Sequence, residues 1–331
     1  MSGSASAAPL ALTMGDPGGI GPEIALKAWA ALKDTGPAFA IHAAPAVMAA
    51  CAAMLGLPAP QAISSNDEAA AVFARALPLI PVEAADPARA TIAAIENAVA
   101  AALSGEASGV VTCPISKAVL YKAGFAHPGH TEFIAALTKS APFEGARGPV
   151  MMLACPELKV TLATIHQPLK DAIASLSPDR VGHVARVTHE ALKRDFAIAR
   201  PRLALAGLNP HAGEGGTMGR EEIDILAPAL ETLRAEGVDI SGPLPPDTMF
   251  HAEARAGYDA AVCLYHDQGL IPVKTLDFHG GVNVTLGLPV VRTSPDHGTA
   301  FDIAGRGVAR PDSLIAAIRL AADMAVARQA A

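Results

Sequence analysis

The sequence predicts an α/β fold built on a mostly parallel sheet. Short apolar runs alternate with helix-like segments along nearly the whole chain. Most of these runs are continuous rather than alternating with polar residues, which is typical of strands covered on both faces. Proline and glycine stand where the helix-like segments begin and end. These observations favour repeated strand–helix units over an all-helical or all-β architecture.

The expected strands leave room for a helix between most consecutive pairs, as parallel pairing requires. In chain order, they are Leu10–Met14, Ala38–His42, Val110–Cys113, Val150–Ala154, Val160–Ile165, Leu203–Leu208, Ala260–Tyr265 and Val282–Leu286. The clearest helices have a proline in the first turn or a glycine after the last one. They are expected over residues 46–55, 86–103, 177–196, 221–236 and 311–328.

Length and composition exclude several classes of protein. The chain has 331 residues, enough for two domains of about 150 residues or one large α/β unit. Hydrophobic residues make up 51% and charged residues 17%, which excludes an intrinsically disordered chain. The formal net charge is −7, and no basic cluster stands out. We therefore expect no nucleic-acid partner.

Membrane insertion and export are not expected either. The longest uncharged stretch, residues 43–60, is rich in alanine and contains three prolines, so it predicts a buried helix rather than a span. No lysine or arginine precedes Lys27, whereas a secretory signal begins with basic residues. The four cysteines are widely spaced, which favours reduced structural thiols. We expect a cytoplasmic protein.

Three expected strands are followed by a histidine, namely His166, His211 and His266. Ligands of parallel α/β sheets bind beyond the carboxyl ends of the strands. Neutral imidazole is a favoured ligand of Zn²⁺ and similar ions, and three histidines leave a position for water or substrate. Two interpretations stay open, because eleven histidines offer many such triples. The three form a divalent-metal site, or they are unrelated loop residues.

A second group of polar residues suits an anion. Lys274, Asn283 and Arg292 follow His266, and lysine with arginine can bind a phosphate or carboxylate. His130 and Thr131 precede an apolar helix whose first N–H groups could face an anion; the alternative is an ordinary helix cap. Separate surface charges are the alternative for the cationic set. Asp247 is a candidate base, orienting group or metal ligand, or a helix cap.

Two glycine-rich loops also follow apolar runs. MGDPGGIGPEI joins a strand to a helix but matches neither common nucleotide-binding glycine motif, so it indicates a tight turn rather than a phosphate loop. NPHAGEGGTMGREE leads into a helix whose first turn carries Glu221 and Glu222. Carboxylates suit a helix N-terminus, so these two need no functional role.

The segments GDPGGIGPE, CPISK, GHTEF, NPHAGEGGTMGREE, DTMF, YHDQGLIPVK and GVNVTLGLPVVRTSPDHGTAFDIAG, in this order, resemble the 4-hydroxythreonine-4-phosphate dehydrogenase family of pyridoxal phosphate biosynthesis. The resemblance extends from about residue 10 to 328. GIGPE and HGTAFDIAG are also similar to segments of isopropylmalate and isocitrate dehydrogenases, which bind NAD without a Rossmann fingerprint. Phe301 stands where those enzymes have proline.

The resemblance implies a two-lobed isopropylmalate-dehydrogenase-like fold with a mostly parallel sheet in each lobe and the active site in the cleft between them. After a flexible tail at 1–9, lobe one, on the nucleotide side, would comprise 10–130 and 295–331. Lobe two, carrying the metal, substrate and dimer contacts, would comprise 131–294. It further implies a homodimer whose active site is shared across the interface, with one metal histidine contributed by the partner.

The resemblance also assigns roles to the candidate residues. The metal ligands would be His166, His211 and His266, holding one Zn²⁺, Mg²⁺ or Co²⁺. The substrate contacts would be His130, Thr131, Lys274, Asn283 and Arg292; Lys274 would also be catalytic, with Asp247 as base or orienting group. NAD, or NADP, would lie against His297, Gly298, Thr299 and Asp302.

The implied reaction is oxidation of 4-phosphooxy-L-threonine to 2-amino-3-oxo-4-phosphooxybutanoate, which decarboxylates to 3-amino-2-oxopropyl phosphate. Three alternatives stay open. A paralogous dehydrogenase would act on a phosphorylated threonate or erythronate, or on a dihydrodiol. A metal-dependent hydrolase or aldolase would use the histidines without nicotinamide. The third alternative is a non-enzymatic binding protein.

Overall fold

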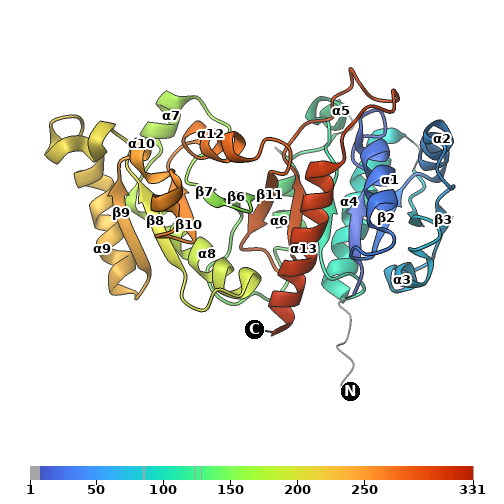
Figure 1. Cartoon of the computed structure of the whole chain (residues 1–331), viewed down its shortest axis with the longest axis horizontal. Helices are drawn as coiled ribbons and strands as arrows, with labels where there is room; N and C mark the ends of the chain where they lie inside the picture. The colour runs from blue at the N-terminus through green and yellow to red at the C-terminus, as the bar shows by residue number, and fades with distance from the viewer. Residues whose placement is uncertain (1–7, 85, 123, 128, 331) are drawn as a thin grey trace. The chain divides into compact units, whose positions relative to one another are not determined.

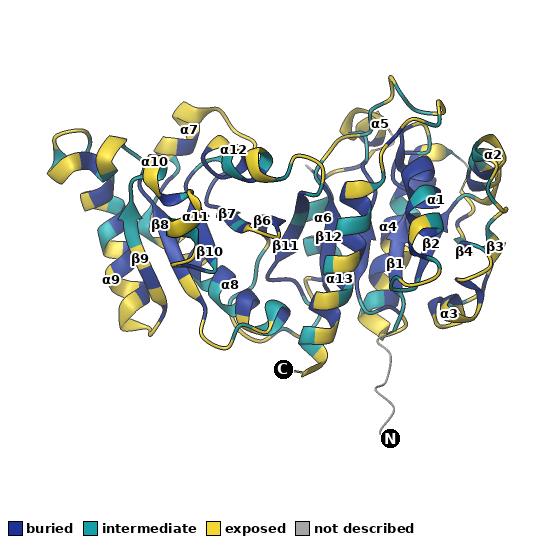
Figure 2. Ribbon diagram, viewed as in Figure 1, coloured by how far each residue is buried: buried dark blue, intermediate teal, exposed yellow. Residues whose placement is uncertain are grey.

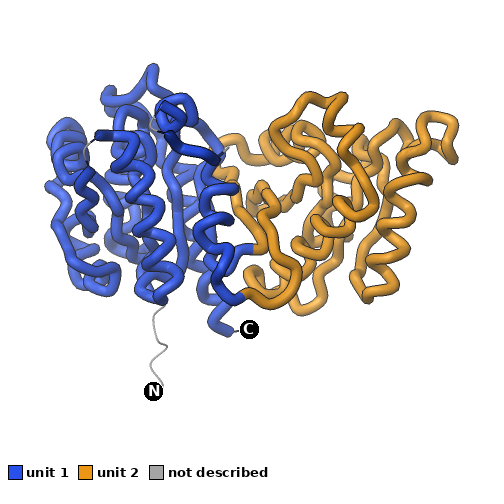
Figure 3. Tube along the Cα trace, turned by 180° about the vertical axis from the view of Figure 1, so that it is seen from behind, with its two compact units in different colours: residues 1–142, 288–330 blue, residues 143–287, 331 orange. Residues whose placement is uncertain are grey.

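The computed structural model describes residues 8–84, 86–122, 124–127 and 129–330 of the chain. The chain divides into two compact units (Figure 3). Unit 1 comprises Met1–Pro142 and Leu288–Ala330, and unit 2 comprises Phe143–Gly287. Of the tail expected at 1–9, residues 1–7 lie outside the described residues. Residues 131–142 and 288–294, expected in lobe two, lie in unit 1.

Unit 1 contains a wholly parallel sheet (Figure 1). Its strand order is β3-β4-β2-β1-β5-β12. β1 and β2 are buried along their whole length, which explains their continuous apolar sequences (Figure 2). The strands are β1 (Leu10–Thr13), β2 (Phe39–Ala43), β3 (Gln61–Ala62), β4 (Pro78–Pro81), β5 (Val110–Thr112) and β12 (Arg292–Pro295).

The long helices of unit 1 begin and end where the sequence indicates. The Asp86 carboxylate caps α4 by accepting a hydrogen bond from the Arg89 amide at 3.0 Å, and Gly105 ends the helix with φ 87°. α4 packs on β1 and β2, and α13 packs on β12 and β5. The helices are α1 (Gly21–Leu32), α2 (Pro45–Leu55), α3 (Ala69–Val72), α4 (Pro87–Ser104), α5 (Lys117–Lys122), α6 (His130–Leu137) and α13 (Asp312–Ala330), with a 3₁₀ turn η1 (Asn66–Glu68).

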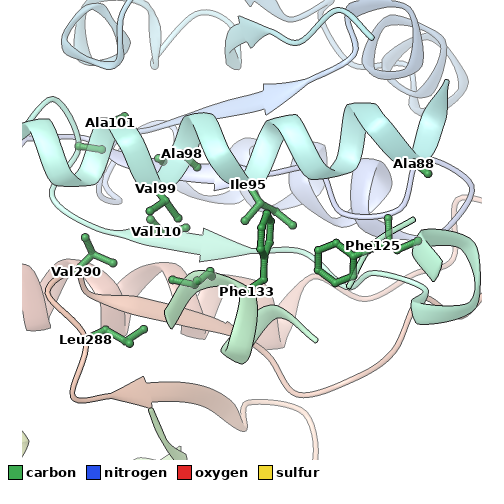
Figure 4. Packing of buried hydrophobic residues seen from close by; sticks show 14 residues of the cluster. Ala88, Ile95, Ala98, Val99, Ala101, Val110, Phe125, Phe133, Leu288 and Val290 are labelled. Carbon is green, nitrogen blue, oxygen red and sulfur yellow. The ribbon is translucent and has the colours of Figure 1, made fainter. Parts of the chain in front are cut away.

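One apolar cluster explains why residues 131–142 belong to unit 1. Phe133 and Ile134 of α6 pack with Ile95 and Val99 of α4 and with Val110 of β5 (Figure 4). Leu288 and Val290 belong to the same cluster. Burying each such side chain contributes about 1.5–3 kcal/mol, so both segments are held to unit 1 by its core.

The sheet of unit 2 has the order β11-β6-β7-β10-β8-β9. β6 runs antiparallel to both β11 and β7, and the remaining pairs are parallel. The mostly parallel α/β class is therefore confirmed in both units. The strands are β6 (Val150–Cys155), β7 (Leu158–Leu162), β8 (Arg202–Ala206), β9 (Asp239–Leu244), β10 (Ala260–Cys263) and β11 (Val282–Leu286).

The helices of unit 2 include one departure from the expected pattern. The predicted helix 221–236 begins as a turn of π-helix before continuing as α9. α8 begins after Ser177, whose hydroxyl accepts a hydrogen bond from the Arg180 amide. The elements are α7 (Leu169–Ala174), α8 (Pro178–Phe196), η2 (Pro210–Gly216), η3 (Glu222–Leu226), α9 (Ala227–Ala235), α10 (Pro246–Met249), α11 (Ala252–Arg255) and α12 (His266–Leu276).

The uncharged stretch at 43–60 forms the short helix α2, close to the predicted 46–55. Only Met48 and Ala52 of α2 are buried, so the expectation of a buried helix is wrong: the helix covers the unit with one narrow face. Within the described part of the chain, no helix has the length and apolarity needed to cross a membrane. All four cysteines are free thiols, and Cys113, Cys155 and Cys263 are buried, as expected for structural residues.

Candidate functional site

The three candidate metal histidines follow neighbouring strands of unit 2. β10 lies between β7 and β8 and is parallel to both, so the carboxyl ends of these strands share one edge of the sheet. The strands end earlier than predicted, at Leu162, Ala206 and Cys263. Each histidine therefore lies in the segment after its strand rather than on the strand itself.

His166 and His266 lie next to each other. Their ring centroids are 5.5 Å apart, and both rings line a pocket of about 480 Å³. Tyr265, Gln167 and Asp267 are also in its wall. Two imidazoles at this separation can ligate one ion, and nitrogen ligands favour Zn²⁺ or Co²⁺ over Mg²⁺.

Asp267 holds the ring of His266. Its Oδ1 lies 2.7 Å from His266 Nδ1. A carboxylate at this position favours the tautomer with the proton on Nδ1, which leaves the lone pair of Nε2 available to a metal ion. The donor set therefore suits a divalent metal.

His211 lies on a different loop, η2, and is exposed. Its backbone is left-handed, with φ 53°. Within the residues that the structure describes, no group of three or more His, Cys, Asp or Glu side chains could hold a metal. A single chain thus brings together His166 and His266, and the third ligand remains a prediction.

In unit 1, the buried Arg292 and the half-buried His130 form a polar site. Arg292 is 3% exposed, and its Nη2 donates a hydrogen bond to Thr112 Oγ1 at 2.8 Å. Burial lowers the pKa of Arg292 to about 10, which leaves it charged at neutral pH. Burial and the Arg292 charge hold the pKa of His130 well below its usual range, so its ring is neutral. His130 Nε2 is buried with no hydrogen-bond partner among the described residues.

Thr131 is in the first turn of α6, beside His130, and is partly exposed. The N-cap residue of α6 is Gly129, so neither His130 nor Thr131 is its cap. Sequence reasoning missed Thr112, which holds the Arg292 guanidinium. Its only signal was its place at the end of an apolar strand.

The remaining substrate and catalytic candidates lie in unit 2. Lys274 is in the last turn of α12, with its ammonium 5.2 Å from the centre of the Phe278 ring. Asn283 is on β11, and its Oδ1 is buried without a hydrogen-bond partner among the described residues. Asp247 is exposed in the first turn of α10, and no side chain caps that helix. The cap interpretation of Asp247 is therefore wrong.

The candidate cofactor residues His297, Gly298, Thr299 and Asp302 form a loop that packs on the glycine-rich turn after β1. The Thr299 carbonyl accepts a hydrogen bond from the Ile20 amide at 2.9 Å. A Cβ on Gly19 would lie 2.9 Å from that same oxygen, so glycine permits the close approach. Phe301, at 50% exposure, lies beside Gly18. The two loops thus form one surface of unit 1.

The chain is similar to known proteins over most of its length. Residues 37–321 match the family described as pyridoxal phosphate biosynthetic protein PdxA. Proteins named 4-hydroxythreonine-4-phosphate dehydrogenase from Caulobacter vibrioides and Maricaulis maris are 56% and 58% identical to it; each alignment covers 97% of this chain and 98% of the relative.

Solved structures agree. A 4-hydroxythreonine-4-phosphate dehydrogenase from Klebsiella pneumoniae has a TM-score of 0.85 at 38% identity, covering 97% of this chain and 99% of that one. A terephthalate 1,2-cis-dihydrodiol dehydrogenase from Burkholderia xenovorans has a TM-score of 0.64 at 32% identity, covering 95% and 97%. The family match extends over most of the chain, and the chain belongs to the PdxA family of pyridoxal phosphate biosynthetic proteins.

Proposed function

We propose that this chain catalyses the NAD- and divalent-metal-dependent oxidation of 4-phosphooxy-L-threonine to 2-amino-3-oxo-4-phosphooxybutanoate. Loss of CO₂ then gives 3-amino-2-oxopropyl phosphate, for pyridoxal 5′-phosphate biosynthesis. The names of the full-length relatives support the substrate. The structural observation that carries the proposal is the buried, charged Arg292 beside the neutral ring of His130.

Arg292 and His130 would bind an anionic group of the substrate. A buried guanidinium can bind a phosphate or carboxylate through two parallel hydrogen bonds. The bond to Thr112 fixes the guanidinium before the substrate arrives. The neutral ring of His130 has two tautomers. In one, Nε2 can accept a hydrogen bond from the substrate; in the other, it can donate one. Thr131, Lys274 and Asn283 are proposed as further substrate contacts.

His166, His211 and His266 would hold the metal. When bound, a divalent ion acts as a Lewis acid that lowers the pKa of the substrate alcohol. Since His166 and His266 already lie together in one chain, we propose that His211 comes from a second copy in a homodimer. Asp247 is proposed as the base or orienting group, and Lys274 as the catalytic cation.

The loop of His297, Gly298, Thr299 and Asp302 would bind the cofactor, which accepts the hydride. The exposed Phe301 ring provides a flat apolar surface beside Gly18, suited to stacking with an aromatic base. We propose NAD as the hydride acceptor, and NADP is the alternative acceptor.

The test measures reduced cofactor by absorbance. The protein, supplied with Zn²⁺ or Co²⁺, receives NAD or NADP together with 4-phosphooxy-L-threonine, phosphorylated threonate, phosphorylated erythronate or a cyclic dihydrodiol. We expect the highest kcat/KM for 4-phosphooxy-L-threonine with NAD. A higher value for the dihydrodiol would contradict the proposal, because that substrate has no phosphate for Arg292.

A further inference from the structure

The loop that carries His211 has an unusual backbone. From His211 to Gly215, five consecutive residues have φ values of 53°, 51°, 80°, 42° and 67°. Three of the five are not glycine, and each L-residue in this left-handed region costs about 1–2 kcal/mol. Such a backbone persists only where surrounding contacts determine it, and it is found most often at functional sites.

The buried carboxylate of Glu222 supplies contacts at the base of this loop. Its Oε1 accepts hydrogen bonds from the amides of Leu208 and Asn209, both at 2.7 Å. Its Oε2 accepts one from Asn209 Nδ2 at 2.8 Å. Burial opposes ionisation of Glu222, but the bonds from Asn209 and Leu208 outweigh it and lower its pKa. Glu222 is therefore a charged anchor for the segment just before His211.

Two glycines permit the close approach of the loop to Glu222 and Asn209. A Cβ on Gly213 would lie 2.7 Å from Glu222 Oε2, and a Cβ on Gly219 would overlap the Asn209 side chain. Glu222 also begins the π-helical turn η3, a feature that occurs frequently at functional sites. Glu222 lies in the first helical turn as expected, and its side chain also reaches back to Leu208 and Asn209, just after β8.

We propose that Glu222 is a positioning residue for His211, fixing residues 208–209 so that the imidazole is presented for metal binding. The inference rests on the proposed function, which makes His211 a metal ligand. Outer contacts of this kind change metal affinity by about 10- to 100-fold when they are removed.

The test is a Co²⁺ titration of the full-length protein, followed by visible absorption. In Glu222→Gln, an amide nitrogen replaces one of the carboxylate oxygens, and the charge that holds both backbone amides is lost. We expect Co²⁺ binding about 10- to 100-fold weaker than in the wild type. The matched control is Asp224→Asn on the same π-helical turn, whose carboxylate pairs with Arg220 at the surface; its affinity should not change.

Thermal unfolding without metal accompanies each titration. If Glu222→Gln does not fold, Asn209→Ala removes the side-chain amide that donates to both Glu222 and Glu221, and it should still weaken Co²⁺ binding. The inference would be overturned if the variant that folds binds Co²⁺ as tightly as the wild type while His211→Ala binds it more weakly. Glu222 would then have a structural role only. Wild-type affinity in His211→Ala would instead overturn the ligand assignment itself, and this inference with it.

Discussion

The imidazole rings of His166 and His266 lie 5.5 Å apart, although a hundred residues separate them in the chain. The parallel pairing of β7 with β10 causes this proximity, because both strands end at the same edge. Asp267 fixes one of the two rings. Within one chain, His166 and His266 are therefore the two candidate metal ligands that already lie close together.

Removing the Asp267 carboxylate should weaken metal binding. Asp267→Asn replaces the charged acceptor at His266 Nδ1, which lowers the basicity of the ring and loosens its orientation. We expect Zn²⁺ affinity to fall about 10-fold or more, measured by competition with a chromogenic chelator. Asp34→Asn, at an exposed site in unit 1, is the control. Equal affinities would show that Asp267 does not act on His266.

Replacing Arg292 should affect the phosphorylated substrate and not the cofactor. Arg292→Lys keeps the charge but loses the planar fork and the geometry of the bond to Thr112. We expect KM for 4-phosphooxy-L-threonine to rise about 30-fold, corresponding to about 2 kcal/mol, while KM for NAD changes little. Exposed Arg89→Lys is the control. A rise confined to KM for NAD would contradict the assignment.

A methyl group on Gly19 should disturb the cofactor loop. The new Cβ would lie 2.9 Å from the Thr299 carbonyl oxygen, so Gly19→Ala must displace one of the two loops. We expect KM for NAD to rise about 10-fold, from a loss of about 1.4 kcal/mol of binding energy. Gly182→Ala is the control, because the nearest atoms to its Cβ would be those of the flexible Arg186 side chain, at 3.3 Å or more. An unchanged KM for NAD in Gly19→Ala would contradict the assignment of this loop to the cofactor site.

Buried His42 should make the protein sensitive to acid. Burial lowers its pKa from 6.5 to about 4, although its bond to Asn66 opposes the shift. The unfolded chain therefore binds the proton more readily, and stability falls as pH drops from 6.5 toward 4, by about 3 kcal/mol in all. His42→Gln should flatten this part of the pH profile in urea unfolding, whereas exposed His183→Gln should not. An unaltered profile in His42→Gln would contradict the prediction.

The cluster around α4 should dominate the stability of unit 1. Ile95 is fully buried, so Ile95→Ala removes apolar contacts and leaves a cavity, costing about 2–5 kcal/mol. Leu103 on the same helix is 42% exposed, so Leu103→Ala should lower the free energy of unfolding by less than about 1 kcal/mol. Urea unfolding compares the two, and similar losses would show that Ile95 is not part of the unit's core.

The fold class could be predicted because strands covered on both faces carry continuous apolar sequences, as in β1, β2 and β6. β4 and β9 were not predicted because both are only partly buried and their sequences lack a continuous apolar run. β4 contains two prolines, and β9 contains a glycine and a proline. β12 was not predicted because polar residues fill it: Arg292, Thr293 and Ser294 are buried there. Local pattern alone does not reveal a buried polar strand whose partners, such as Thr112, are distant in sequence.

The site was predictable in part for the same reason. Histidines after apolar runs mark strand ends, so the meeting of His166 and His266 follows from the parallel sheet. The left-handed backbone at His211 and the reach of Glu222 to Leu208 and Asn209 depend on tertiary contacts. A carboxylate in a helix-like run gives no sign of which amides it will meet.

We propose that this chain needs both a divalent metal and NAD to oxidise 4-phosphooxy-L-threonine. The most direct measurement is the rate of NADH formation by protein stripped of metal with a chelator, before and after Zn²⁺ or Co²⁺ is restored, in the wild type and in His166→Ala. We expect no NADH from the stripped protein, recovery in the wild type and none in His166→Ala. Full NADH formation by the stripped protein would contradict it.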